Sequence, residues 1–96
     1  MKVCVIIPTY NEAKAIAGII KEIRSQSLEV VIIDDGSLDN TSLIAAQNGA
    51  VVLKNERNQG KGASLLKGFS YALNHGFDAV ITMDGDGQHD PTDIQA

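Results

Sequence analysis

The chain has 96 residues, 44% of them hydrophobic, and its 12 acidic and 8 basic residues give a formal net charge of −4. A chain of this length forms one small domain at most, and its hydrophobic content excludes a disordered protein. The acidic balance argues against nucleic acid as a partner, because phosphate backbones select basic surfaces. The single cysteine, Cys4, lies in an apolar run, so we expect a buried side chain and no catalytic thiol.

The apolar runs are short. Each has about five residues, whereas a membrane-spanning helix needs about 20. No charged-then-apolar signal peptide opens the sequence. We therefore expect a cytoplasmic segment without a membrane span.

Apolar runs alternate with amphipathic stretches along the chain. Buried strands are predicted by the β-branched runs at 3–7, 30–33, 50–53 and 79–83. Asn11 is expected to cap the first helix, a weaker helix covers 41–48, and a third follows the polar loop 55–62. The first helix has an apolar stripe of Ile16, Ile19, Ile20 and Ile23, and the third has one of Leu65, Leu66, Phe69, Ala72 and Leu73.

This alternation predicts the α/β class, with three α/β/α layers around a mostly parallel sheet. Ligands of such sheets bind beyond the carboxyl ends of the strands, where this chain has polar clusters at 8–12, 34–37 and 84–89. An incomplete sheet with an exposed edge favours association, so a homo-oligomer is one expectation. Asp90 and Pro91 have the sequence pattern of a helix start, but only a few residues follow them. We therefore expect these 96 residues to be the amino-terminal part of a longer protein.

The cluster Asp84-Gly85-Asp86-Gly87-Gln88 is the strongest chemical signal. Alternate residues of an extended chain project to one side, so Asp84, Asp86 and Gln88 can converge on a hard cation such as Mg²⁺ or Mn²⁺. The other interpretation is an exposed acidic turn. An EF-hand is excluded, because His89 and Gln95 occupy the positions where glycine and glutamate are required.

A basic loop is the second signal. Residues 54–67 carry four basic side chains and one acidic one, and include Asn58-Gln59-Gly60-Lys61-Gly62. The spacing does not match a Walker loop, so a diphosphate contact and a solvated basic face both stay open. Asp35 is a candidate nucleoside contact or a turn residue. Residues 8–12 lack the glycine fingerprint of nicotinamide-dependent enzymes, which argues against that class of enzyme.

Four segments in order resemble family 2 glycosyltransferases, nearest the dolichol- or polyprenyl-phosphate sugar synthases. They are residues 7–12 (IPTYNE), 34–41 (DDGSLDNT), 58–62 (NQGKG) and 84–91 (DGDGQHDP). The resemblance implies that residues 1–96 are the Rossmann-like, donor-binding half of a GT-A domain whose acceptor-binding half is absent. It also implies inverting transfer of a sugar from a UDP- or GDP-linked donor, with a polyprenyl phosphate as one acceptor. We expect these residues alone to be inactive.

The resemblance implies roles for five residues on the nucleotide side of the site. Pro8, Tyr10 and Glu12 match positions that line the nucleoside pocket. Asp35 matches the acid that reads the base or ribose, and Lys61 matches a position near the donor.

On the metal side, the resemblance implies that Asp84 and Asp86 are the two acids of a DxD motif and are catalytic through the metal they hold. Gln88 matches a further ligand, and Gly85 lies within the donor site. The cofactor implied is Mg²⁺ or Mn²⁺. Two other functions stay open, a non-catalytic α/β binding module and another nucleotide-dependent transferase.

Overall fold

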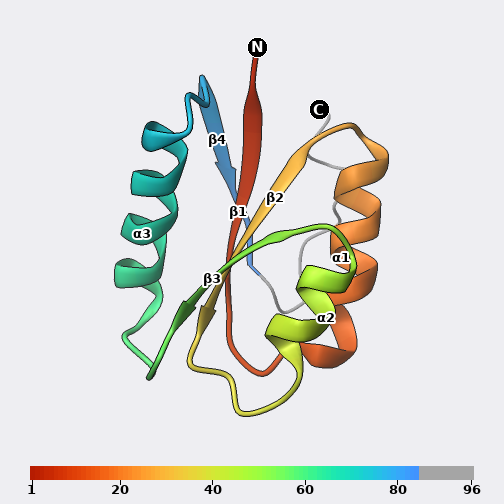
Figure 1. The fold of residues 1–96 in the computed structure, drawn as a ribbon, viewed down its shortest axis with the longest axis vertical. Helices are drawn as coiled ribbons and strands as arrows, with labels where there is room; N and C mark the ends of the chain where they lie inside the picture. Colours follow the sequence, from red (N-terminus) through yellow and green to blue (C-terminus); the bar gives the residue numbers. More distant parts are fainter. Residues whose placement is uncertain (85–96) are drawn as a thin grey trace.

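A computed structural model describes residues 1–84. Its elements are β1 (Val3–Thr9), α1 (Ala13–Ser25), β2 (Glu29–Asp35), α2 (Thr41–Gln47), β3 (Val51–Asn55), α3 (Lys61–Asn74) and β4 (Ala79–Thr82). The strands form one parallel sheet in the order β3-β2-β1-β4. Helices α1 and α2 cover one face of the sheet and α3 covers the other (Figure 1). The predicted three-layer α/β/α fold is confirmed.

The core divides into two clusters, one on each face of the sheet, because successive strand residues point to opposite faces. The cluster under α1 and α2 contains Val5, Ile7, Val30, Ile32 and the predicted stripe Ile16, Ile19, Ile20 and Ile23. The cluster under α3 contains Cys4, Ile6, Val31, Ile33 and Ala72. Cys4 is fully buried, as predicted, and burial raises the pKa of its thiol.

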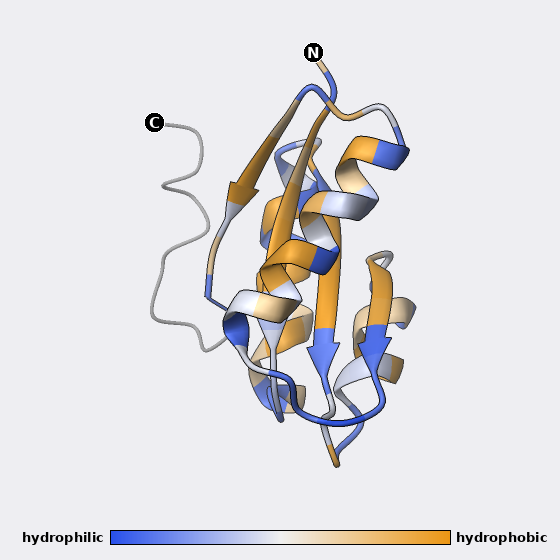
Figure 2. Ribbon diagram, turned by 90° about the vertical axis from the view of Figure 1, so that its left-hand side faces the viewer, coloured by the Kyte–Doolittle hydropathy of each residue, from blue (hydrophilic) through white to orange (hydrophobic). Residues whose placement is uncertain are grey.

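Strands β1, β2 and β3 extend further than their apolar runs, whereas β4 ends at Thr82, one residue before the end of its predicted run. Figure 2 shows strands whose length is mostly hydrophobic and whose arrowheads are hydrophilic. The parallel ladder continues to the pairs Thr9 with Asp34 and Asp35 with Asn55, beyond the apolar residues that the sequence pattern detects. Each polar tip is therefore held by backbone pairing. Within residues 1–84, no helix is long and apolar enough to cross a membrane.

The prediction that Asn11 caps α1 is wrong. Helix α1 begins at Ala13, and the Asn11 side chain instead accepts a hydrogen bond from the Leu38 backbone N–H at 2.8 Å. The Glu12 N–H at the start of the helix donates to Thr41 Oγ1 at 3.0 Å. The side chain of Asp39 accepts from the Ala13 N–H at 3.3 Å. Asp39 of the β2–α2 connection and Thr41 at the start of α2 therefore bind the N–H groups at the start of α1, and the two segments are joined.

The predicted apolar stripe of α3 is wrong in part. Leu66 and Leu73 are 67% and 81% exposed, while the face against the sheet consists of Ser64, Gly68 and Ala72. The cause is close approach, because a Cβ atom at Gly68 would lie 2.5 Å from Ile6 Cγ2. Leu65 and Phe69 flank this contact as predicted.

Candidate functional site

A cleft of about 320 Å³ lies at the carboxyl ends of the strands. It occurs where the strand order reverses, because β1 has β2 on one side and β4 on the other, and such reversal points bind ligands in α/β folds. The cleft is lined by Pro8, Thr9, Tyr10, Glu12, Asp35, Asn58, Gly60, Lys61 and Asp84. The structure thus brings together six of the site residues proposed from sequence, which are Pro8, Tyr10, Glu12, Asp35, Lys61 and Asp84. The other three, Gly85, Asp86 and Gln88, lie outside the described residues.

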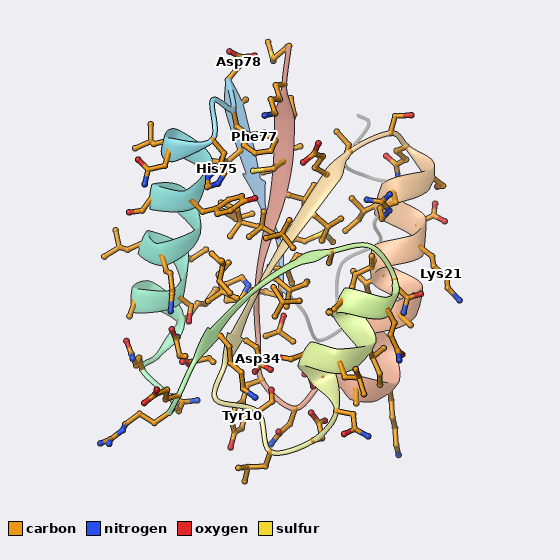
Figure 3. The ribbon with its side chains drawn as sticks, in the orientation of Figure 1. Tyr10, Lys21, Asp34, His75, Phe77 and Asp78 are labelled. Carbon is orange, nitrogen blue, oxygen red and sulfur yellow. The ribbon has the colours of Figure 1, made fainter. Side chains whose placement is uncertain are left out.

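The two adjacent aspartates at the end of β2 have different partners. Asp34 accepts hydrogen bonds from the Ser37 N–H at 2.9 Å and from the Ser42 hydroxyl. It lies at the same end of the sheet as Tyr10, whereas His75, Phe77 and Asp78 lie at the opposite end (Figure 3). Both oxygens of Asp34 thus accept hydrogen bonds from the segment after β2, and this side chain holds that turn.

Asp35 lines the cleft and is nevertheless buried, with 5% of the residue exposed. Its Oδ1 accepts from Gln59 N at 2.7 Å and from Asn55 Nδ2 at 3.0 Å, and its Oδ2 accepts from Gly60 N at 2.9 Å. Burial acts to raise the pKa of Asp35, but the hydrogen bonds from Gln59, Asn55 and Gly60 outweigh it and hold the pKa below its ordinary value. The carboxylate is therefore ionised and bound to the 55–60 loop.

Gly36 allows that loop to pack against the end of β2. Its φ is +80°, and a Cβ atom there would lie 2.7 Å from Asn58 N and 2.8 Å from the Arg57 carbonyl carbon. A side chain at this position would be strained by the backbone and blocked by the loop. The motif Asp34-Asp35-Gly36-Ser37 thus shapes the loop before Lys61 as well as the turn after β2.

Lys61 begins α3 and reaches across the cleft. Its Nζ lies 2.6 Å from Asp84 Oδ1, and the two side chains are 63% and 34% exposed. An ion pair this exposed to solvent contributes about 0–1 kcal/mol to stability, so a ligand can replace either partner. The basic loop and the first acid of the DxD segment therefore meet at one wall of the cleft.

Sequence reasoning missed Asn55. Its Nδ2 also contacts Ser64 Oγ at 3.2 Å, and its Oδ1 accepts from Lys67 Nζ at 2.8 Å. The available signal was that this polar residue ends the mostly apolar strand β3, at the edge of the sheet where ligands bind. Asn58 and Gly60 line the cleft as well, and both lie within the glycine-containing loop singled out by the sequence.

No group of three or more metal-binding side chains occurs among residues 1–84. The expected metal ligands are Asp84, which lines the cleft, and Asp86 and Gln88, which fall outside the described part of the chain.

Comparison with known proteins identifies the family. The model of the family described as Glycosyl transferase family 2 matches residues 4–96. The chain belongs to this family. The resemblance to family 2 glycosyltransferases that the motifs indicate is confirmed. Solved GT-A enzymes share the fold of this chain.

Curated relatives include an uncharacterized protein of Methanocaldococcus jannaschii, 37% identical over 98% of this chain. A UDP-N-acetylglucosamine–dolichyl-phosphate N-acetylglucosaminyltransferase of Methanococcus voltae is 33% identical over 93% of the chain. An undecaprenyl-phosphate mannosyltransferase of Micrococcus luteus is 35% identical over 98% of it. The chain spans 39%, 43% and 42% of the lengths of these three relatives, respectively.

Solved structures with the same fold include mannosyl-3-phosphoglycerate synthase of Rubrobacter xylanophilus, with a TM-score of 0.81 and 28% identity over 94% of this chain. Glucosyl-3-phosphoglycerate synthase of Mycobacterium tuberculosis, in complex with Mn²⁺, UDP-glucose and phosphoglyceric acid, has a TM-score of 0.76 and 26% identity over 88% of the chain. The chain spans 32% and 33% of these two proteins.

Proposed function

We propose that the protein transfers a sugar from a nucleoside diphosphate sugar to an acceptor, and that residues 1–96 are the donor-binding half of its domain. One observation carries this proposal. Side chains from the ends of β1 and β2, the start of α3 and the residue Asp84 after β4 line one cleft at the reversal point of a family 2 fold. The cleft combines apolar, acidic and basic surface, which suits the base, ribose and diphosphate of a nucleotide.

In this proposal the nucleoside lies against Pro8, Tyr10 and Glu12. Tyr10 is 44% exposed, so its ring offers an apolar surface and its hydroxyl a polar group. The diphosphate lies near Lys61, the one basic residue among those that line the cleft in the described part of the chain. The complex of the mycobacterial relative with UDP-glucose supports a UDP-linked donor, and a GDP-linked donor is the alternative that the experiment includes.

The donor set of the metal motif fits a hard divalent cation, because it offers two carboxylates and one amide oxygen. The position of Asp84 supports this, since its carboxylate lines the cleft and pairs with the ammonium group of Lys61. Asp84, Asp86 and Gln88 would hold Mg²⁺ or Mn²⁺. When bound, the cation supplies charge stabilisation for the departing diphosphate. Solved complexes of the mycobacterial synthase contain Mn²⁺ or Mg²⁺.

The acceptor we propose is a polyprenyl phosphate, because the names of two relatives specify dolichyl and undecaprenyl phosphates. A phosphate acceptor is already ionised and needs little help from a base, which suits inverting displacement at the anomeric carbon. The acceptor-binding residues would lie in the part of these relatives that the chain does not span. Residues 1–96 alone would therefore not catalyse sugar transfer. We place the reaction at the cytoplasmic face of the membrane.

Calorimetry tests the proposal. UDP- and GDP-linked sugars are titrated into the protein with and without MnCl₂, and into Asp86→Asn. The control is Glu29→Gln, an equivalent loss of charge at an exposed residue where β2 begins. We expect one nucleotide sugar to bind, Mn²⁺ to tighten binding, and only Asp86→Asn to abolish the Mn²⁺ effect. An equal Mn²⁺ effect in the protein and in Asp86→Asn, or no nucleotide binding at all, would contradict the proposal and favour a non-catalytic binding module.

A further inference from the structure

We propose that Asn11 is a positioning residue for the nucleoside part of the cleft, and that it acts by orienting Tyr10 and Glu12, the residues on either side of it. Both neighbours line the cleft, whereas Asn11 is not among the residues that line it. This inference rests on the proposed function, which places a nucleoside against Tyr10 and Glu12. It goes beyond that function, because it assigns what holds this part of the site in shape.

The backbone of Asn11 is left-handed. Its φ is +51°, and within residues 1–84 only Asn11 and Ser27 among the non-glycine residues have a positive φ. This conformation costs free energy in a residue with a Cβ atom, and asparagine and aspartate tolerate it best after glycine. The backbone conformation of a residue sets the angle between its two neighbours. The turn at Asn11 therefore decides how Tyr10, which follows β1, and Glu12, which precedes α1, face the cleft.

Two hydrogen bonds to the β2–α2 connection hold Asn11 in this conformation. Its Oδ1 accepts from the Leu38 N–H at 2.8 Å, and its own N–H donates to Ser37 Oγ at 2.8 Å. Ser37 is buried, which fixes the position of its hydroxyl. A strained backbone persists only where the surrounding structure determines it. These two bonds therefore maintain the turn between Tyr10 and Glu12.

Asparagine meets two requirements at this position. It tolerates the left-handed backbone, and its side chain supplies the oxygen that accepts from Leu38. Aspartate meets both requirements, glycine meets only the first, and alanine meets neither. If the turn at Asn11 orients the nucleoside wall, nucleoside affinity should follow this order of residue types.

Loss of the Asn11 bond would release residues 10–12 and leave the diphosphate side of the cleft in place. Lys61 begins α3 and Asp84 follows β4, and these two side chains pair with each other. A ligand that has only a nucleoside should therefore lose as much affinity as one that also has a diphosphate. Loss of the Lys61 side chain should instead affect only the ligand with the diphosphate.

Uridine and UDP distinguish the two sides, because uridine has the base and ribose but no diphosphate. Their dissociation constants are measured by NMR titration at fixed MgCl₂ for the unaltered protein, Asn11→Asp, Asn11→Gly, Asn11→Ala and Lys61→Ala. Urea unfolding shows that each variant is folded under the conditions of the titration. Guanosine and GDP replace the two ligands if the calorimetry above selects a GDP-linked donor.

Ser27→Gly is the matched control. Ser27 also has a left-handed backbone, with a φ of +63°. It lies in the turn between α1 and β2, at the end of the sheet opposite the cleft. The control therefore changes a residue of the same conformation without touching the site.

We expect Asn11→Gly to weaken the binding of uridine and of UDP by the same factor, about three- to tenfold, as the loss of one hydrogen bond implies. Asn11→Ala should lose at least as much affinity and unfold at a lower urea concentration, because alanine also bears the cost of the left-handed backbone. Asn11→Asp should bind uridine within about twofold of the unaltered protein. Uridine is uncharged, so the added carboxylate does not enter that comparison. Lys61→Ala should weaken the binding of UDP alone, and Ser27→Gly should weaken neither.

Unchanged uridine affinity in Asn11→Gly would overturn this inference. So would an equal loss of uridine affinity in Asn11→Asp and Asn11→Gly, or a loss in Ser27→Gly. If Asn11→Gly does not fold, Ser37→Ala removes the other hydrogen bond of Asn11 and decides by the same comparison of the two ligands. Failure of the unaltered protein to bind UDP and GDP would overturn the proposed function and this inference together. Nucleotide binding without nucleoside binding would overturn this inference alone.

Discussion

The contact of α3 with the sheet makes Gly68→Ala an informative substitution. The added Cβ atom would lie 2.5 Å from Ile6 Cγ2, 2.9 Å from Ile33 Cδ1 and 3.2 Å from Ile6 Cδ1. Carbon atoms in ordinary contact are about 3.5–4.0 Å apart, so α3 must withdraw by about 1 Å or the two isoleucines must change rotamer. Both isoleucines are fully buried, which leaves their side chains little room to move.

The expected cost follows from two opposing effects. Overpacking of a core costs about 1–3 kcal/mol, and replacing glycine by alanine within a helix returns about 1 kcal/mol. The free energy of unfolding should therefore fall by up to about 2 kcal/mol, which lowers the melting temperature by up to about 15 °C in a domain of this size. Urea and thermal unfolding followed by circular dichroism measure both quantities.

Gly18→Ala provides the matched control, because Gly18 lies within α1 and an added Cβ atom there meets nothing within 4 Å. It should raise the free energy of unfolding by about 0.5–1 kcal/mol. If Gly68→Ala proves as stabilising as Gly18→Ala, α3 does not pack closely on the sheet, and the explanation given for the exposed Leu66 and Leu73 is refuted.

Three further predictions concern the cleft. Gly36→Ala should lower the free energy of unfolding by about 2–4 kcal/mol in urea titrations, because it adds a clash with Asn58 to a left-handed backbone; a change below about 1 kcal/mol would contradict the packing of the loop. Lys61→Ala should change the free energy of unfolding by less than about 1 kcal/mol, since the ion pair of Lys61 is exposed. The same variant should bind UDP more weakly in calorimetry. Unchanged UDP affinity would show that Lys61 is not part of the donor site. The folded-state pKa of Asp35 lies below the ordinary value of 3.8, so the ionised group stabilises the protein above that pH and loses this effect as pH falls through the folded-state pKa. The stability difference between the protein and Asp35→Asn should therefore narrow below pH 3.8 in urea titrations at successive pH values, and a difference independent of pH would show that the charge is not responsible.

The sequence predicted what depends on local pattern. Runs such as Val30–Ile33 define a strand, and the spacing of Ile16, Ile19, Ile20 and Ile23 defines a helix face, because each pattern repeats with the period of its element. Convergence of the polar clusters also followed, since the carboxyl ends of parallel strands share one edge of the sheet. The cleft around Tyr10 and Asp84 lies at that edge.

Features set by tertiary contact could not be predicted. The partners of Asp35 lie 20 to 25 residues away in the chain, and no spacing rule connects them. Asn11 has the right type and place for a helix cap, but the β2–α2 connection supplies competing side chains. For α3, leucine content indicated the wrong face in part, because the helix approaches the sheet through its smallest residues.

The pleat of β2 gives its two aspartates a consequence for strand alignment. Val30, Val31, Ile32 and Ile33 are all buried, two on each face, so sliding β2 by one residue would mostly exchange similar β-branched side chains, while it would bring the charged Glu29 or Asp34 into the apolar interior. The same slip would turn Asp34 toward the α3 side and Asp35 toward α2, and each carboxylate would lose its hydrogen-bond donors. The hydrophobic residues thus hold the strand in the sheet without fixing its alignment, and the acidic tip acts as a register lock.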